Sequence, residues 1–354
     1  MARRRKRLDP AAFDLPVEAI TRGRFTHPSA LLSRDVLAAG ERRPVVTVQF
    51  VADRAGVVAG LDESIAVLRL GVDDWGALTV HALYDGDRVE GGDAVMTVEG
   101  ELHRFAHLAS LCVGVLARRT RVCTNARLLS ETARPKPVLA LPALHDHFLA
   151  AFPGDSHAAQ VGGALLLSGL AHPGVRNQPP LLLVPHALVA AHGGDTVAAI
   201  RACVAHAPPK TELVVPVDYE NDAVETARAV ARAQVGRVWG VQLATSEHLV
   251  DRSIIPMMGA FPPAGVSPQL AWNVREALDA EGAGEIRIVV SGTFTAERIR
   301  RYEEDGVPVD AYGVGAALNE GVWGFHADVV TLDGEPHARV GFGARPNPKL
   351  ERVR

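Results

Sequence analysis

From about residue 136 onwards, short apolar segments of strand length alternate with longer segments of helical periodicity. One of the helical segments carries Ala223, Ala227, Val230 and Ala231 on a single face. Repeated βα units of this kind predict a mainly parallel sheet, which is either open or closed as a barrel. The predicted strands are residues 137–141, 181–184, 212–217, 238–243, 286–290 and 309–312, and the predicted helices are residues 158–171, 196–206, 222–234, 268–281 and 295–304.

The chain before that point has a different pattern. Residues 45–51 alternate in the manner of a strand, and residues 67–70 are a further short strand candidate. Residues 78–100 combine extended segments with turn signals, which predicts a small antiparallel unit, and residues 104–133 have helical periodicity. Residues 327–345 again predict strands, which rejoin this first part of the chain.

The composition bounds the class of protein. With a net charge of −4 over 354 residues the chain has no large basic field for nucleic acid, and the basic run at residues 3–7 is predicted to be a solvated tail. Cys112, Cys123 and Cys203 form no CxxC pair, so neither a disulfide framework nor a zinc site is predicted. No apolar stretch follows the basic run as in a secretory signal, and the longest apolar runs are too short to span a bilayer. We expect a cytoplasmic protein of two domains with no nucleic-acid partner and no membrane partner.

The most informative segment is the predicted strand at residues 286–290 and the turn after it. The strand ends in Ser291, Gly292 and Thr293, and Thr295 is then a predicted helix N-cap. Glycine lets the backbone approach an anion closely, and hydroxyl groups with free amides at a helix start can hold one. The segment therefore predicts a phosphate-binding turn.

One βα unit later a second strand runs into a glycine-rich turn, which consists of Gly313, Val314 and Gly315. Turns after the last two strands form the common phosphate site of α/β barrels. The alternative is that these glycines only make tight turns. Two such turns in tandem, each at a strand end, favour phosphate binding.

Two polar residues follow other predicted strands. His186 comes after the strand at residues 181–184, where it can act as an acid, a base, a nucleophile or a phosphate partner. A structural hydrogen bond at the strand end is an equally good interpretation of His186. Asp218 follows the next strand and can bind a sugar hydroxyl or a hydrated Mg²⁺, whereas Asp222 is predicted to cap the following helix.

Two further polar groups carry weaker signals. The His-Asp-His run at residues 145–147 is interpreted as an exposed loop, because a metal site needs further ligands and none is indicated. Arg118, Arg119 and Arg121 are either solvated or supply positive charge to a polyphosphate substrate.

Together these segments resemble the nicotinate phosphoribosyltransferase family and, more distantly, quinolinate phosphoribosyltransferase, over residues 78–345. The resembling segments are residues 84–100 (YDGDRVEGGDAVMTVEG), 115–124 (VLARRTRVCT), 185–188, 192–195, 217–222, 290–293, 312–316, 327–330 and 338–341. The resemblance implies an α/β fold in which an N-terminal α/β sandwich domain precedes an irregular, TIM-like α/β barrel. The corresponding bounds are residues 1–130, completed by 327–354, for the sandwich and residues 131–326 for the barrel.

The resemblance also implies a reaction in NAD biosynthesis. A phosphoribosyl group would pass from phosphoribosyl pyrophosphate to nicotinate or a related base, with His186 as the catalytic histidine. Residues 291–293 and 313–315 would hold the ribose 5′-phosphate, and Asp218 would contact the ribose or a metal-bound water. Mg²⁺ accompanying the pyrophosphate substrate, ATP as an optional co-substrate, and a homodimer or higher homo-oligomer are further implications.

The chain departs from the family at positions that bind substrate. Paired arginines after the first barrel strand are replaced by Leu-His at residues 144–145, and an Arg-Leu-Asp is replaced by Gln-Leu-Ala at residues 242–244. Each lost charge-assisted hydrogen bond costs about 1.5–3 kcal/mol. The predicted substitutes in substrate binding are Arg118, Arg134, Lys136 and Gln242. The alternative is a catalytically degenerate homologue that binds a nucleotide or phosphosugar and regulates or scaffolds a partner.

Overall fold

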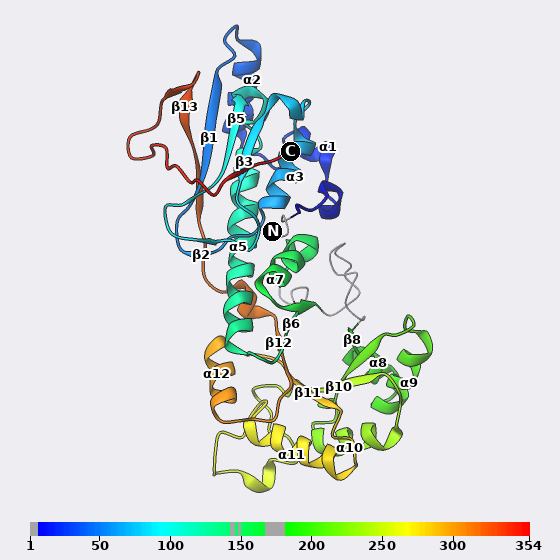
Figure 1. The fold of residues 1–354 in the computed structure, drawn as a ribbon. Helices are drawn as coiled ribbons and strands as arrows, with labels where there is room; N and C mark the ends of the chain where they lie inside the picture. Colours follow the sequence, from blue (N-terminus) through cyan, green and yellow to red (C-terminus); the bar gives the residue numbers. More distant parts are fainter. Residues whose placement is uncertain (1–5, 142–145, 148–149, 167–180) are drawn as a thin grey trace, which may run out of the picture. The chain divides into compact units, whose positions relative to one another are not determined.

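The computed structural model describes residues 6–141, 146–147, 150–166 and 181–354 (Figure 1). The chain divides into two compact units. The first consists of Met1–Asn125, Leu149–Gly162 and Asn319–Arg354, and the second consists of Ala126–Phe148 and Gly163–Leu318. Among the described residues, no helix has both the length and the apolar character needed to cross a bilayer.

The first unit is built on an antiparallel sheet of six strands in the order β14-β13-β1-β5-β3-β15. The central strand β1 (Val45–Ala52) pairs with β5 (Ala94–Glu101) on one side and with β13 (Phe325–Leu332) on the other. The predicted strand at residues 45–51 and the predicted antiparallel unit at residues 78–100 are confirmed. The chain returns to this sheet through β13 after the barrel is complete.

Helices α3 (Leu61–Gly71) and α5 (Ala109–Thr132) pack against this sheet and share its buried core. The predicted strand at residues 67–70 is wrong, because these residues lie inside α3. The error came from a window of four residues. Over the full segment the buried Leu61, Ile65 and Leu68 recur at helical spacing.

The remaining elements of the first unit are short. They are η1 (Pro10–Phe13), α1 (Val17–Thr21), α2 (Pro28–Ala39), β2 (Gly56–Val57), η2 (Trp75–Ala77), β3 (Thr79–Ala82), β4 (Arg88–Val89), α4 (Leu102–Phe105), the π-helical turn η4 (Ala151–Asp155), α7 (Ser156–Gly162), β14 (Glu335–Pro336) and β15 (Glu351–Arg352).

The second unit contains a parallel sheet of seven strands in the order β7-β6-β12-β11-β10-β9-β8. The strands from β8 to β12 are neighbours in chain order. β12 then pairs with β6, and β6 pairs with β7. That is the strand order of an α/β barrel opened between β7 and β8. The predicted fold class, a sandwich domain with an irregular barrel, is therefore confirmed. The strands are β6 (Val138–Ala140), β7 (Leu165–Leu166), β8 (Leu181–Leu183), β9 (Glu212–Pro216), β10 (Val238–Leu243), β11 (Arg287–Val290) and β12 (Ala311–Val314).

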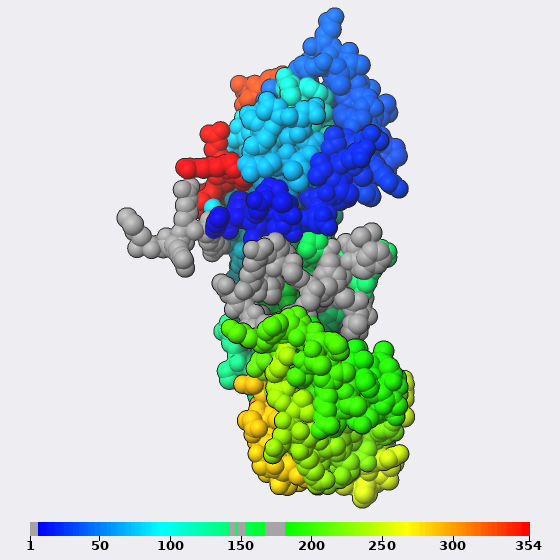
Figure 2. All heavy atoms as spheres, turned by 90° about the vertical axis from the view of Figure 1, so that its right-hand side faces the viewer, coloured from blue at the N-terminus to red at the C-terminus, as the bar shows by residue number. Residues whose placement is uncertain are grey.

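Helices cover the outside of these strands, as Figure 1 shows for α10, α11 and α12. The segments coloured green to yellow-green in Figure 2, which include α8 to α10, form the face of the second unit turned toward the viewer. The four residues predicted to face inward from α10 are its buried residues. The outer helices are α8 (His186–Ala191), α9 (Thr196–His206), α10 (Ala223–Ala233), α11 (Pro268–Ala280) and α12 (Ala296–Glu304), with the short η6 (Ile255–Met257) and η7 (Ala316–Asn319).

The helix predicted at residues 158–171 is shorter than expected. It ends at Gly162, and Gly163 then adopts a φ of +107°, a conformation that breaks a helix. The chain passes directly into β7, so the apolar residues after the glycines form a strand. Residues 167–171 of the predicted helix lie outside the described residues.

The interior of the barrel is filled in layers. One buried cluster takes Leu139, Val214, Val289 and Ala311 from four different strands, together with neighbours from the other strands. Side chains two residues further along each strand point to the same face. We call this next set the carboxyl-end layer, and it consists of Leu141, Pro216, Gln242, Ser291 and Gly313.

Candidate functional site

The turn after β11 has the geometry of an anion-binding site. Ser291 is buried, Gly292 adopts a φ of +114°, and Thr293 is exposed. The side chain of Thr295 accepts a hydrogen bond from the Arg298 amide and so caps α12. Among the described residues, no group accepts a hydrogen bond from the amides of Gly292 or Thr293. Free amides beside a helix N-terminus attract anions, so this turn is able to hold a phosphate group.

The second predicted turn is shorter than expected. Gly313 and Val314 lie within β12, which pairs with β6 as far as Val314, and only Gly315 follows the strand. The glycine at position 313 is required for another reason. A Cβ atom there would lie 2.8 Å from the Cβ of Ser291. The ends of β11 and β12 are therefore in close contact, with Ser291 packed directly against Gly313.

His186 and Asp218 meet at the carboxyl ends of β8 and β9. His186 is the first residue of α8, and Asp218 follows β9 by two residues. The His186 Nε2 atom lies 3.0 Å from Asp218 Oδ1. The imidazole is 47% exposed and the carboxylate only 10% exposed. The two residues predicted as catalytic thus form a pair that has one face open to a ligand.

The electrostatics of this pair favour a charged imidazole. The hydrogen bond that His186 donates to Asp218 raises the pKa of His186, partial burial opposes the shift, and the negative charge of Asp218 adds to it. At neutral pH more of His186 is therefore protonated than in a free histidine. A positive charge is available at the carboxyl end of the barrel, although the family's arginines are absent.

Gln242 and Ser291 link the ends of β10 and β11. Gln242 Nε2 donates to Ser291 Oγ at 2.8 Å, and both residues are buried. The Oε1 atom of Gln242 and the hydroxyl of Thr245 are buried and have no hydrogen-bond partner among the described residues. Gln242 therefore contacts the first residue of the turn after β11.

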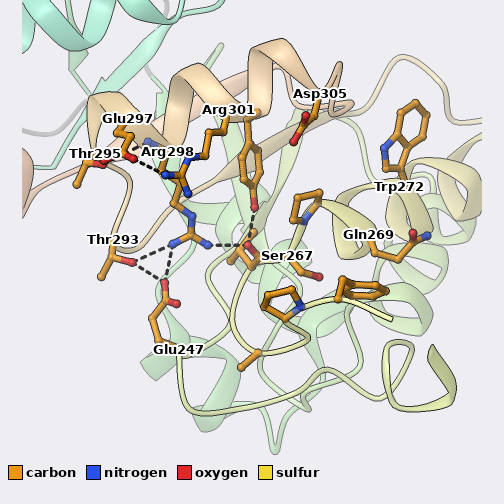
Figure 3. Close-up of a pocket in the computed structure, with 16 residues that line it drawn as sticks. Glu247, Ser267, Gln269, Trp272, Thr293, Thr295, Glu297, Arg298, Arg301 and Asp305 are labelled. Atoms are coloured by element: carbon orange, nitrogen blue, oxygen red, sulfur yellow. Dashed lines mark hydrogen bonds and ion pairs between the residues drawn. The ribbon is translucent and has the colours of Figure 1, made fainter. Parts of the chain in front are cut away.

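Thr293 is held by two charged side chains that sequence analysis did not identify (Figure 3). Its hydroxyl donates to Glu247 Oε1, and Arg298 lies 2.9 Å from Thr293 Oγ1 and 2.7 Å from the same Glu247 oxygen. The hydrogen bond from Thr293 and the nearby Arg298 guanidinium keep the pKa of Glu247 below its usual range. No sequence motif marks this triad, because Glu247 lies in an irregular segment.

A pocket of about 830 Å³ opens beside this triad, between α11 and α12. Thr293 and Arg298 line it on one side, and Trp272 and Gln269 of α11 lie on the other (Figure 3). His186, Asp218 and Ser291 are not among its lining residues. The pocket therefore lies on the helical side of Thr293, outside the group formed by the strand ends.

Two of the three basic residues predicted to replace the family's arginines lie away from this group. Lys136 and Arg134 precede β6, at the amino end of the parallel strands, whereas barrel sites form at the carboxyl ends. Lys136 pairs with Glu303 at 2.7 Å, and Arg134 is exposed. Arg118, in the first unit, pairs with the buried Asp155 at 2.8 Å.

The His-Asp-His run is only partly described. Asp146 and His147 are exposed, and the carboxylate of Asp146 accepts a hydrogen bond from the His147 amide. His145 lies outside the described residues.

Among the described residues, one group has metal-ligand spacing, and it lies in the first unit. It consists of Asp62, Asp85 and His157, with 3.2 Å between His157 Nε2 and Asp85 Oδ2. Arg7 pairs with Asp62 at 2.9 Å and already supplies a positive charge there. We infer no metal site from this group.

Comparison with known proteins is consistent with this architecture. The family model of the N-terminal domain of quinolinate phosphoribosyl transferase matches residues 30–120. A nicotinate phosphoribosyltransferase of Mycobacterium tuberculosis is 29% identical over 282 residues, which is 76% of this chain and 57% of the relative. The chain thus spans little more than half the length of that relative.

Solved structures share the fold. The nicotinate-nucleotide pyrophosphorylase of Pyrococcus furiosus matches with a TM-score of 0.75 at 23% identity, over 95% of this chain and 84% of that chain. The human nicotinic acid phosphoribosyltransferase matches with a TM-score of 0.62 at 17% identity, over 96% of this chain and 77% of that chain.

The chain shares with these solved structures a fold in which an antiparallel-sheet domain and a parallel α/β barrel follow one another in one chain. In sequence, the chain is similar to the nicotinate and quinolinate phosphoribosyltransferases, as a divergent relative.

Proposed function

We propose that this protein transfers a phosphoribosyl group from phosphoribosyl pyrophosphate to nicotinate or a related base in NAD biosynthesis. The ring nitrogen of the base attacks C1 of the ribose while the bond from C1 to the pyrophosphate oxygen breaks, and pyrophosphate leaves with the electron pair. One observation carries the proposal: the free amides after β11 lie at the same end of the barrel as the His186–Asp218 pair. A phosphate holder and a titratable pair at one end are what this reaction requires.

The ribose 5′-phosphate is proposed to bind at the turn after β11. The amides of Gly292 and Thr293 and the N-terminus of α12 face an anion there, and Gly315 follows the neighbouring strand. This site uses mainly backbone groups. It therefore does not depend on the arginines that the chain lacks.

His186 is proposed to act on the pyrophosphate end of the substrate. Asp218 orients the imidazole through Nε2 and favours its protonated form, so that the ring stabilises negative charge on the leaving pyrophosphate. The carboxylate of Asp218 also favours the positive charge that develops on the ribose in the transition state. His186 thus stabilises the negative charge of the leaving group, and Asp218 stabilises the positive charge on the ribose.

Mg²⁺ fits this site as an ion that accompanies the substrate. Asp218 offers one carboxylate oxygen beyond the one bonded to His186, and Mg²⁺ prefers oxygen ligands and retains waters. Among the described residues, no group of three ligands surrounds Asp218. The ion would neutralise charge on the pyrophosphate.

The test is release of pyrophosphate from phosphoribosyl pyrophosphate with nicotinate or nicotinamide and Mg²⁺, with and without ATP. ATP is proposed as an optional co-substrate, so stimulation by ATP is expected but not required. His186→Ala is expected to lower kcat by roughly 10²-fold or more. His192→Ala is the matched control, because His192 ends the same helix and is exposed. Equal turnover in both variants would remove the proposed role of His186.

The same experiment tests the alternative that this protein is a regulatory or scaffolding homologue without catalytic activity. Such a protein would bind a mononucleotide, seen as a rise in Tm, and would release no pyrophosphate with any base.

A further inference from the structure

The described residues of the carboxyl-end layer include no cation. Leu141 and Pro216 are apolar, Gly313 has no side chain, and Gln242 and Ser291 are polar but neutral. The charged pair that follows β8 and β9, His186 and Asp218, is assigned above to the pyrophosphate and the ribose, so its positive charge is not free for the base. A carboxylate that enters this layer would lose its water without gaining an opposite charge, which is unfavourable. The described part of the layer therefore suits a neutral group.

Two polar atoms in this region require a partner. Gln242 is 5% exposed, its Nε2 atom donates to Ser291, and its Oε1 atom has no partner among the described residues. The hydroxyl of Thr245, two residues after β10, is buried and likewise lacks a partner. Buried polar atoms without partners are rare in folded proteins and call for an explanation.

The chemistry of these two groups distinguishes between possible ligands. An ionised carboxylate only accepts hydrogen bonds, so it leaves the Gln242 carbonyl unsatisfied. A carboxamide has two N–H donors for that carbonyl and one oxygen that can accept from the Thr245 hydroxyl. If the Gln242 amide is turned over, it presents an N–H group, which is still neutral and does not replace an arginine for binding a carboxylate.

Gln242 contacts a residue of the proposed substrate site. Its partner Ser291 is the first residue of the turn proposed to hold the ribose 5′-phosphate, and Gly292 follows directly. A nucleotide bound at that turn therefore lies beside the residue that Gln242 contacts.

We infer that the acceptor base carries a carboxamide rather than a carboxylate, and that Gln242 and Thr245 recognise this group. The inference rests on the proposed phosphoribosyl transfer and narrows its acceptor to a neutral base. Gln242 is then a specificity-determining residue.

The test compares binding of two product nucleotides, nicotinamide mononucleotide and nicotinic acid mononucleotide, to the full-length protein by calorimetry. Binding does not require turnover. The amide nucleotide is expected to bind about tenfold more tightly or better. Gln242→Leu should remove this preference without changing the affinity for inorganic pyrophosphate, and Gln242→Arg should favour the acid nucleotide. Gln269→Leu is the control, because Gln269 lies on α11 and bonds Asn273.

The possible outcomes separate the inference from the proposed function. Equal binding of both nucleotides, or tighter binding of the acid form, overturns the inference and leaves phosphoribosyl transfer standing. If neither nucleotide binds, both the proposed function and the inference fail. If the amide preference survives Gln242→Leu at full strength, Gln242 is not the residue that recognises the base.

Discussion

His186 Nε2 lies 3.0 Å from Asp218 Oδ1, although 32 residues separate the two in the chain. They meet because β8 and β9 are parallel neighbours whose carboxyl ends lie at the same edge of the sheet. The contact fixes the orientation of the imidazole and raises its pKa. Two predictions depend on this pair.

The first concerns the titration of His186. Asp218→Asn removes the carboxylate, so the pKa of His186 should fall toward the ordinary value of 6.5, as measured by an NMR titration. Because the folded-state pKa is raised, the pair stabilises the fold fully below the unfolded pKa and loses this effect as the pH rises through the folded pKa. The difference in the free energy of unfolding between the two proteins should therefore be largest in acid and vanish in alkali. An unchanged titration would contradict the contact.

The second concerns the pH dependence of turnover. If the protonated imidazole stabilises the leaving pyrophosphate, kcat should decline as His186 loses its proton at high pH. In Asp218→Asn this decline should begin at lower pH, and kcat near neutrality should fall by roughly 10²-fold. Measuring kcat from pH 5 to 9 in both proteins checks this. An alkaline limb at the same pH in both would show that another group titrates.

Long segments with a strong period could be predicted from the sequence. The helix from Ala223 was predicted with its buried face, and Thr295 was predicted as a cap, because amphipathic spacing and capping are local properties. The strand at residues 67–70 was wrong because a four-residue window cannot distinguish a strand from a buried helix. The end of the helix after Gly162 was missed because the apolar residues beyond it continue the pattern.

The candidate site could be predicted only where it follows strand ends. His186, Asp218 and Ser291 each come within three residues of the end of a strand, and parallel strands bring such positions together. Glu247 and Arg298 gave no signal, because their contact with Thr293 depends on how an irregular segment folds back. Lys136 was selected for its charge, although its place before β6 assigns it to the opposite end of the barrel.

The contact between Gly313 and Ser291 predicts the effect of adding one methyl group. In Gly313→Ala the new Cβ would lie 2.8 Å from the Cβ of Ser291, so the ends of the strands must move apart. The free energy of unfolding should fall by about 1–3 kcal/mol, as measured in urea. Gly236→Ala is the control, because no atom in the described part of the chain lies within 4 Å of a Cβ there. Equal stability in both variants would mean that the two strands are not packed this closely.

A buried arginine in the first unit makes a separate prediction. Arg119 bonds both oxygens of Glu63, at 2.7 and 2.9 Å, and also contacts the buried Asp155. Arg119→Met leaves two buried carboxylates without this partner, so unfolding should become easier by about 3–5 kcal/mol. The control is Arg22→Met, because Arg22 is 77% exposed and pairs only at the surface. A loss below 1 kcal/mol in Arg119→Met would show that water reaches these carboxylates.

The triad of Thr293, Glu247 and Arg298 makes the last prediction. Glu247 holds the hydroxyl of Thr293 and so fixes the turn whose amides are proposed to bind phosphate. Glu247→Gln replaces charged hydrogen bonds by neutral ones at a site that is 44% exposed, a loss of about 1 kcal/mol. The KM for phosphoribosyl pyrophosphate should rise about fivefold at constant kcat, as measured by steady-state kinetics.

Glu297→Gln is the matched control, because Glu297 is an exposed acid of α12 that pairs with Arg301 instead. The pH dependence provides a second check. The pKa of Glu247 is lowered in the folded protein, so its contribution to stability is complete above the unfolded pKa and disappears as the pH falls through the folded pKa. The KM values of wild type and Glu247→Gln should therefore converge in acid. A lower KM in Glu247→Gln would contradict this role, because it would mean that the carboxylate competes with the phosphate for Thr293 and Arg298.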